Sequence, residues 1–555
     1  MAPPLHRHGA PTMMRRHRRG GSRATGTDGT TSPRLPMSDL TPHRILDSLR
    51  ALPADRLRGV RRGIEKESLR AQPDGSLART PHPAALGSAL THPRITTDFS
   101  ESQLELITGV HGSAQACLDE LTQIHQFVYR SIGDERLWVA SMPCCLPADE
   151  QIPIARYGSS NIGRAKSVYR TGLSHRYGRR MQTISGIHYN WSMPGVSTDG
   201  YFALIRNFRR HAFLLIYLFG ASPAVCSSFV AGHPHGLQPL ADNTLGLPHA
   251  TSLRMGRLGY QSDAQAALAV SYNSLDSYAA SLHDALIRPH PAYEDIGVRD
   301  ADGEYRQLST SLLQIENEFY GTIRPKRVIR PGERPLHALR ERGVEYIEVR
   351  CMDLDPFVPV GIAESTARFL DVFLLHCLLA DSPQDSPQET AALACNQERV
   401  AARGREPGLR LQRGRTEVSL VEWGAQLLRE CAPIAAALDA LHGGNGHRDA
   451  LLAAQAGLEN PAQLPSARVL AAMAASFGGA HVPFVRARCE AARQDLLARP
   501  WSTAQAAHFQ ALTQQSLQDR QAIEAADRTP FEDFRQQYLA PEQLQPTRTA
   551  SAHGA

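Results

Sequence analysis

The feature that most constrains this fold is a set of segments in which acidic and apolar residues alternate with a period of two. Side chains on a β-strand point to opposite faces in turn, so two acids separated by one residue share a face. Glu65 and Glu67 stand in this relation, and Glu348 alternates with Ile347 and Val349. The pattern predicts strands that carry a polar, functional face over a buried one.

Further segments show the same alternation and add an acid in apolar surroundings. Glu105 lies among Leu104, Leu106 and Ile107, where a carboxylate is unfavourable unless it has a partner. The other members of the pattern are Asp98, the pair His188 and Asn190, the set Glu316, Glu318 and Tyr320, and Arg350. Magnesium in nucleotide sites is usually held by a few carboxylates together with phosphates. Two interpretations stay open: a metal site across adjacent strands, or acids on the solvated face of an antiparallel sheet.

Residues 151–194 form a basic stretch without any Asp or Glu. Its charged residues are Arg156, Arg164, Lys166, Arg170, Arg176, Arg179 and Arg180. Guanidinium groups bind carboxylates and phosphates through paired hydrogen bonds. The stretch is interpreted as a clamp for small anions, as a stacking groove for single-stranded nucleic acid, or as an exposed loop. A second candidate for anion binding follows at Arg324, Lys326 and Arg327.

The net charge of +5 does not indicate a basic surface, because the positive charge is concentrated at the start of the chain. Residues 1–36 carry seven Arg and one Asp, so the remaining residues are close to neutral. Nine cysteines without a C-x-x-C pair fit a reducing, cytoplasmic compartment better than a disulfide framework. No apolar run reaches the length of a membrane span. The Walker-type phosphate loop, H-E-x-x-H and G-x-S-x-G are absent as well.

Composition and periodicity divide the chain into four expected parts. Apolar residues recur at helical spacing late in the sequence, which predicts a helical region there. The expected parts are a disordered Arg-rich extension (1–36), a catalytic sheet region (37–380), a helical region packed on it (381–535) and a disordered tail (536–555). Met37 would be a natural start, because Thr41-Pro42 has the pattern of a helix N-cap and first residue.

Six segments taken together resemble the bacterial glutamate–cysteine ligases of the first class. They are 62–70 (RGIEKESLR), 96–101 (TTDFSE), 157–161 (YGSSN), 185–190 (SGIHYN), 218–223 (LFGASP) and 345–350 (EYIEVR). The resemblance runs in order from about Leu40 to Pro530. It implies an α+β fold related to glutamine synthetase, in which a curved antiparallel sheet forms an open funnel with surrounding helices and a helical C-terminal region. The inner face of that sheet is expected to bind ATP and metal.

Carried over position by position, the resemblance implies roles for individual residues. Glu348 and Arg350 are expected to be catalytic. The implied metal ligands are Glu65, Glu67, Asp98, Glu105, His188 and Glu348. The implied substrate-binding residues are Phe99, Tyr169, Arg170, Leu173, Gln182, Arg254, Tyr260 and Tyr320. Arg350, Arg324 and Lys326 are expected to face the nucleotide phosphates.

The resemblance also implies the reaction, the ligation of the glutamate γ-carboxylate to the amine of cysteine through a γ-glutamyl phosphate. This is the first step of glutathione synthesis, with ATP as co-substrate and Mg²⁺, or Mn²⁺, as cofactor. A monomer without nucleic-acid or membrane partners is expected by analogy. The alternatives are a related ligase with another amine acceptor, a single-strand nucleic-acid binder using residues 151–194, and a non-catalytic regulator.

Overall fold

The longest strand organises the central sheet of this protein. In the computed structural model, which describes residues 41–259, 263–266 and 268–547, strand β1 spans Arg61–Ala71. It pairs antiparallel with β3 (Gln103–Ile107) along one edge and with β5 (Ile187–Ser192) along the other. Because β1 pairs with a different strand along each edge, it joins the two halves of the sheet.

The sheet continues outward from β1 in both directions. Its order is β2-β3-β1-β5-β10-β9, with β4 (Arg136–Leu137) also paired to β1. The outer strands are β2 (Ile95–Thr97), β10 (Tyr346–Met352) and β9 (Ile323–Lys326), and all of these pairings are antiparallel. The sheet is open, since β2 and β9 do not pair with each other. The predicted α+β fold with an open antiparallel sheet is confirmed.

One face of the sheet is apolar and is covered by helices. Ile64, Tyr189 and Ile347 are almost fully buried on this face. Helix α3 (Ala114–Ser131) packs on β1 and β3, and α5 (Thr198–Phe219) packs on β9 and β10. Each helix begins after a serine whose side chain accepts a backbone N–H of the first turn, which satisfies an otherwise unpaired donor. Helix α10 (Glu364–Leu379) packs against both α5 and α3.

Shorter elements surround this core. The other helices before residue 380 are α1 (Thr41–Ala51), α2 (Ala54–Arg58), α4 (Asn161–Tyr177), α6 (Asp263–Ala266), α7 (Leu275–Ile287), α8 (Pro291–Glu294) and α9 (Pro335–Arg342). A small sheet is formed by β6 (Ala224–Cys226), β8 (Thr244–Gly246) and β7 (Gln238–Ala241). The helix expected after Thr41-Pro42 is therefore present as α1.

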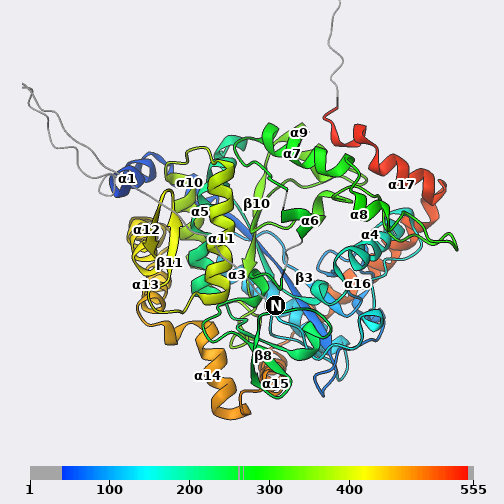
Figure 1. Cartoon of the computed structure of the whole chain (residues 1–555), viewed down its shortest axis with the longest axis horizontal. Helices are drawn as coiled ribbons and strands as arrows, with labels where there is room; N and C mark the ends of the chain where they lie inside the picture. Colours follow the sequence, from blue (N-terminus) through cyan, green and yellow to red (C-terminus); the bar gives the residue numbers. More distant parts are fainter. Residues whose placement is uncertain (1–40, 260–262, 267, 548–555) are drawn as a thin grey trace, which may run out of the picture. The chain divides into compact units, whose positions relative to one another are not determined.

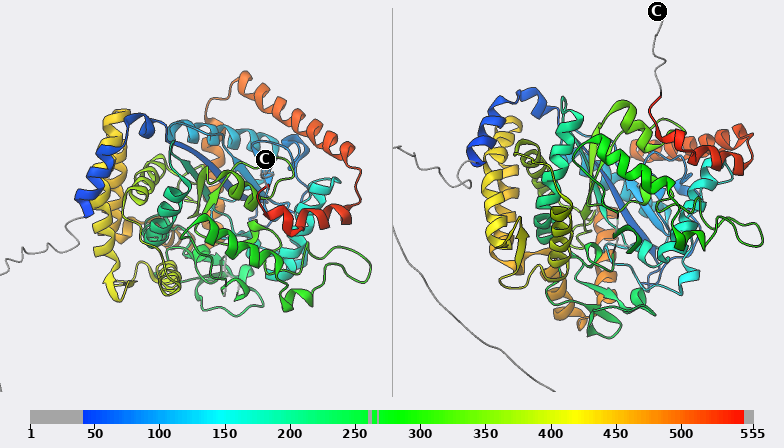
Figure 2. Two further views of the ribbon diagram at one scale, coloured as in Figure 1. Left: turned by 90° about the horizontal axis from the view of Figure 1, so that it is seen from above. Right: turned by 45° about the horizontal axis from the view of Figure 1, so that its top comes forward.

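The C-terminal part is helical, as predicted, with one hairpin that the sequence pattern did not indicate. The hairpin consists of β11 (Arg410–Arg413) and β12 (Thr416–Ser419). The helices are α11 (Pro387–Arg403), α12 (Leu420–His442), α13 (Gly446–Glu459), α14 (Pro465–Phe477), α15 (His481–Ala498), α16 (Thr503–Ala526) and α17 (Phe531–Leu539). Figures 1 and 2 show α12 and α13 at the opposite end of the sheet from α16 and α17.

The expected boundaries can be compared with the helices of the structure. The helices after residue 380 pack on the preceding part, with α12 and α13 on α10 and α15 on α3, and the chain from Thr41 onward forms one compact unit. The expected tail begins too early, since α17 runs to Leu539 and a 3-10 turn follows at Pro541–Leu544. The expected extension, 1–36, and residues 548–555 lie outside the described residues.

Among the described residues, no individual helix has both the length and the apolar character needed to cross a membrane. One pair, α14 and α15, meets the criterion only when its two helices are taken together, and the pair is bent by 99°.

A buried ion pair ties the sheet to the helical layer. Arg62 on β1 contacts both carboxylate oxygens of Asp371 on α10, with Nη2 lying 3.0 Å from Oδ2 and Nε lying 3.3 Å from Oδ1. The hydroxyl of Tyr189 on β5 donates to the same carboxylate at 2.9 Å. Because all three side chains are buried, each charge depends on the other for its compensation.

The substitution Asp371→Ala is expected to lower the free energy of unfolding by about 3–5 kcal/mol, because it leaves the Arg62 charge buried without its partner. Urea unfolding would measure this. The exposed pair Arg58–Asp55, in which the Asp55 side chain is 94% exposed, provides the control, and Asp55→Ala should leave the unfolding midpoint unchanged. Equal effects of the two substitutions would contradict the assigned role of the buried pair.

Candidate active site

Strand pairing brings the predicted acids together on the second face of the sheet. Glu67 stands opposite Glu105, and Glu65 stands opposite His188. Glu348 stands opposite Asn190 and Arg324 on its two neighbouring strands. Directly opposed residues in an antiparallel pair have their side chains on the same side of the sheet. Five strands therefore contribute to one polar face, and the predicted acids on these strands form a single cluster there.

His188 lies at the centre of this cluster. Its Nδ1 is 3.2 Å from Glu65 Oε2 and 3.7 Å from Glu348 Oε1, and its Nε2 is 3.6 Å from Glu67 Oε1. Asn190 orients Glu65 by donating from Nδ2 to Oε1 at 2.9 Å. The backbone N–H of Gly186 donates to Glu67 Oε2 at 2.6 Å. These contacts hold the carboxylates in fixed orientations.

Two carboxylates on the β1–β3 side of the cluster, Glu105 and Glu67, have raised pKa values. Burial raises the pKa of Glu105 well above its ordinary value, and the charges of Glu65 and Asp98 raise it further. Burial also raises the pKa of Glu67. One ligand atom from each of Glu65, Glu105 and His188 lies within 4.8 Å of the others. Crowded oxygen donors with one imidazole are a donor set that a divalent cation could neutralise.

The opposite side of the cluster, at β9 and β10, is rich in positive charge. Lys326 Nζ is 3.2 Å from Glu348 Oε1, and the guanidinium groups of Arg350 and Arg324 are 3.1 and 3.8 Å from Oε2. Burial acts to raise the pKa of Glu348, but the charges of Lys326 and Arg350 outweigh it and hold that pKa well below its ordinary value. Arg324 and Lys326 of the second anion candidate thus lie beside the acids together with Arg350, whereas Arg327 lies 3.4 Å from Glu345.

Helix α4 forms a wall of the site out of the basic stretch. The exposed-loop interpretation is therefore wrong for Asn161–Tyr177. Tyr169 and Leu173 pack in one apolar cluster with Phe99, which follows β2. Arg170 stacks over Tyr157 at 4.6 Å and donates to the backbone carbonyl of Asp98. This wall of the site therefore presents both apolar side chains and the guanidinium group of Arg170.

The end of the described chain supports this wall. Phe531 belongs to the apolar cluster of Phe99, Tyr169 and Leu173. The start of α4 is held by Asp527, which accepts from the backbone N–H of Asn161. The side chain of Asn161 also donates to the Thr529 carbonyl at 2.8 Å. The position of α4 thus depends on the segment that links α16 to α17.

Gln182 and Tyr320 lie together, as the predicted pocket requires, with Gln182 Nε2 donating to the Tyr320 hydroxyl at 2.9 Å. Tyr260 lies outside the described residues. The strand face predicted for Glu316, Glu318 and Tyr320 is wrong, because Glu316–Glu318 form a 3-10 turn. Glu316 and Glu318 instead form ion pairs that hold neighbouring segments together.

Each of these two acids has an arginine partner. Glu316 Oε2 is 2.7 Å from Arg334 Nη2, and Glu318 Oε1 is 2.9 Å from Arg176 Nη1. These pairs use the charges locally, so neither acid joins the cluster around His188.

Arg254 is the second predicted carboxylate-binding arginine and is almost fully buried. Its Nη2 donates to the Arg350 carbonyl at 2.8 Å, and its Nη1 lies 3.8 Å from Asp353 Oδ1. Asp353 is held in turn by the hydroxyls of Ser222 and Ser252 at 2.6 and 3.0 Å. The guanidinium group is thereby placed beside the end of β10.

Two residues of the site were not among the predicted ones. Gly186 leaves room for Arg254, since a Cβ at this position would lie 2.0 Å from Arg254 Nη2. Asp353 orients the same arginine. Both roles depend on contacts between distant segments. Lys166, which the sequence analysis included in the basic stretch, is half-buried on α4, where desolvation, with the charge of Arg170, lowers its pKa to about 8.

A cavity of about 620 Å³ extends from the site between α5, α11 and the segment 319–322. Arg254, Arg350 and Tyr320 line it. Three further arginines at its edge are each paired with an acid: Arg209 with Asp385, Arg210 with Glu389 and Arg257 with Glu398. The cavity connects three predicted site residues, and five arginines stand among its otherwise largely apolar and neutral lining.

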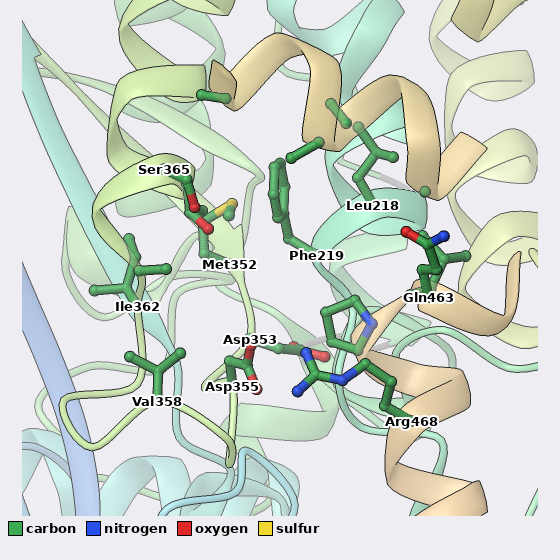
Figure 3. Close-up of a pocket in the computed structure, with 18 of the residues that line it drawn as sticks. Leu218, Phe219, Met352, Asp353, Asp355, Val358, Ile362, Ser365, Gln463 and Arg468 are labelled. Atoms are coloured by element: carbon green, nitrogen blue, oxygen red, sulfur yellow. The ribbon is translucent and has the colours of Figure 1, made fainter. Parts of the chain in front are cut away.

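A second cavity, of about 320 Å³, lies beyond the end of β10 and contains none of the predicted site residues. Figure 3 shows Arg468 of α14 extending toward Asp353 and Asp355 in this cavity. The cavity touches the site only through Asp353, whose carboxylate faces Arg254. It is therefore a neighbour of the active site and not part of it.

Comparison with known proteins agrees with this geometry. The family model described as glutamate-cysteine ligase matches residues 46–400. A glutamate–cysteine ligase of Alcanivorax borkumensis is 48% identical over 89% of this chain and 98% of its own length. The enzyme of Azotobacter vinelandii is 48% identical over 91% of this chain and 99% of its own length.

Solved structures give the same result. The glutamate–cysteine ligase of Francisella tularensis, crystallised with AMP, has a TM-score of 0.83 and 36% identity, covering 87% of this chain and 98% of that one. A bifunctional glutathione synthetase of Pasteurella multocida has a TM-score of 0.66 and 25% identity, covering 85% of this chain and 58% of that one. Matched in its sequence and its fold, the chain belongs to the glutamate–cysteine ligase family.

Proposed function

We propose that this protein uses ATP and Mg²⁺ to join the γ-carboxylate of glutamate to the amine of cysteine on the acidic face of its sheet. The family assigns the reaction, which yields γ-glutamylcysteine, ADP and phosphate. One observation carries the site assignment. The register of β3, β1, β5 and β10 places the carboxylates around His188, with the cations of β9 and β10 alongside.

The residues that would hold Mg²⁺ are Glu65, Glu67, Asp98, Glu105, His188 and Glu348. Their oxygen-rich donor set fits a hard cation, and the raised pKa of Glu105 reflects burial among like charges. When bound, the cation supplies positive charge to the phosphate oxygens of ATP.

The cationic residues beside Glu348 would bind the transferred phosphoryl group. Lys326 and Arg350 flank the Glu348 carboxylate, so they lie where negative charge collects as the γ-carboxylate of glutamate attacks ATP. Fixed donors aimed at developing charge stabilise the transition state without reorganising. The product of this step is the γ-glutamyl phosphate.

The wall of α4 would serve the second step, in which the cysteine nitrogen attacks the acyl carbon and phosphate leaves. Phe99, Tyr169 and Leu173 form an apolar surface that excludes water, which would otherwise hydrolyse the acyl phosphate. Arg170 and Arg254 are suited to the amino-acid carboxylates. A small, partly apolar pocket distinguishes cysteine from similar amines by only about 1–3 kcal/mol.

The test of this proposal is ADP release by the purified protein with ATP, Mg²⁺ and glutamate, measured with cysteine, 2-aminobutyrate, glycine or no acceptor. We expect release to require both amino acids and to yield a thiol dipeptide with cysteine. Preference for another amine would show that the residues of α4 were wrongly assigned to a cysteine-binding pocket. Absence of release with every acceptor would contradict the proposal.

Glu348→Gln is expected to lower kcat by about a hundredfold or more, because it removes a buried charge that both metal and cations contact. Steady-state kinetics would measure this, with circular dichroism to show that the fold is intact. Glu345→Gln is the matched control, since Glu345 is exposed just before the same strand. Near-normal turnover of a folded Glu348→Gln variant would remove Glu348 from the site.

Gly186→Ala is expected to displace the Arg254 guanidinium, because the new Cβ would lie 2.0 Å from its Nη2. The KM for one amino-acid substrate should rise about tenfold or more, which corresponds to about 1.4 kcal/mol, while the KM for ATP stays unchanged. Gly236→Ala is the matched control, as a Cβ there meets nothing within 4 Å. Unchanged KM values for glutamate and cysteine would contradict the role given to Arg254.

A further inference from the structure

A cluster of nitrogen and sulfur ligands lies outside the acidic site, among the helices that cover the apolar face of the sheet. His211 lies on α5, and His376 and Cys377 lie on α10. One ligand atom from each of these residues lies within 4.8 Å of the other two. Helix α12 packs on α10 beside them and contributes Glu430. Figure 1 shows α5, α10 and α12 as neighbours.

The hydrogen bonds around this cluster leave its histidine nitrogens available as ligands. His376 Nε2 is 2.8 Å from Glu430 Oε2. The Nδ1 atoms of His376 and His211 are buried without a hydrogen-bond partner among the described residues. An unsatisfied buried nitrogen is unfavourable. A carboxylate that accepts from one ring nitrogen, while the other nitrogen faces a metal, is a recurrent arrangement around metal-binding histidines.

The charges in this region are of both signs. Burial, with the charge of His376, lowers the pKa of His211 well below its ordinary value. Arg413 and Arg210 face His211 as well. Arg210 is paired with Glu389, whereas Arg413 stacks over Trp423 at 5.1 Å and donates to the neutral amide of Gln426. A divalent ion with the Cys377 thiolate and the Glu430 carboxylate is neutral in total.

We propose that His211, His376 and Cys377 bind a zinc ion, with Glu430 orienting His376. One thiolate with two imidazoles is the ligand type that selects Zn²⁺ and excludes Mg²⁺. In a tetrahedral zinc site the ligand atoms are roughly 3.5 Å apart, so small side-chain rotations would close the present spacing. Water supplies the fourth ligand, on the side where His211 is partly exposed. The ion clamps α5 to α10 and does not take part in the ligation reaction.

The test uses the full-length protein, freed of transition metals by a chelator and kept in excess Mg²⁺. Titration with Co²⁺ should give the visible absorption bands of a tetrahedral Co²⁺ ion and a thiolate-to-metal charge-transfer band, which saturate at one ion per chain. Zn²⁺ should displace the Co²⁺, remove these bands and raise the Tm of the protein. Absence of the charge-transfer band in the wild-type protein would overturn the proposal.

Variants assign the ligands. Cys377→Ser should abolish the charge-transfer band, and His211→Asn, at a partly exposed position, should abolish the zinc-dependent rise in Tm. Glu430→Gln should keep the band but weaken zinc binding by about 10–100-fold. Cys395→Ser, at an exposed cysteine of α11, is the control and should change nothing. A band that persists in Cys377→Ser, or disappears in Cys395→Ser, would show that the metal is bound elsewhere.

Discussion

The structure depends on the electrostatic balance of several carboxylates gathered on one face of an antiparallel sheet. Carboxylates removed from water are unfavourable unless charges or hydrogen-bond donors compensate them. Glu348 has Lys326 and Arg350 beside it, and Glu67 has the backbone of Gly186. Burial, with the charges of Glu65 and Asp98, raises the pKa of Glu105. The face thus carries a carboxylate of raised pKa on one side and closely paired cations on the other.

The opposite face of the same strands keeps this arrangement rigid. Glu105 and Glu348 alternate with buried apolar residues, and Glu65 and Glu67 alternate with Ile64 and with the buried side chains of Lys66 and Ser68. Helices α3 and α5 pack against the backs of the strands that carry the site. The Arg62–Asp371 pair fixes α10 to β1. A side chain held by packing and by buried hydrogen bonds keeps its orientation, and preorganised groups of this kind are the main contribution of a protein to phosphoryl and acyl transfer.

The local part of the site was predictable from sequence, whereas the contacts between segments were not. Period-two alternation is a local property, so Glu65 and Glu67 could be assigned to one face of their strand, and Glu348 and Arg350 to one face of another, before any pairing was known. The opposition of Glu67 and Glu105 depends on the register of two strands, which alternation alone does not specify. The turn at Glu316–Glu318 was misassigned because its acids also alternate. The role of Gly186 follows only from the approach of Arg254, far along the chain.

The support of α4 by the segment after α16 has a consequence for biosynthesis. The ribosome makes the chain from the N-terminus, so β1, β3, β5 and β10 can all pair while the residues that hold Asn161 and complete the cluster of Tyr169 are still untranslated. A nascent chain would then present the acidic face without the finished wall that keeps water from the acyl intermediate. The wall of the pocket is therefore completed only after this segment has been synthesised, and a stop codon before it would leave the pocket incomplete.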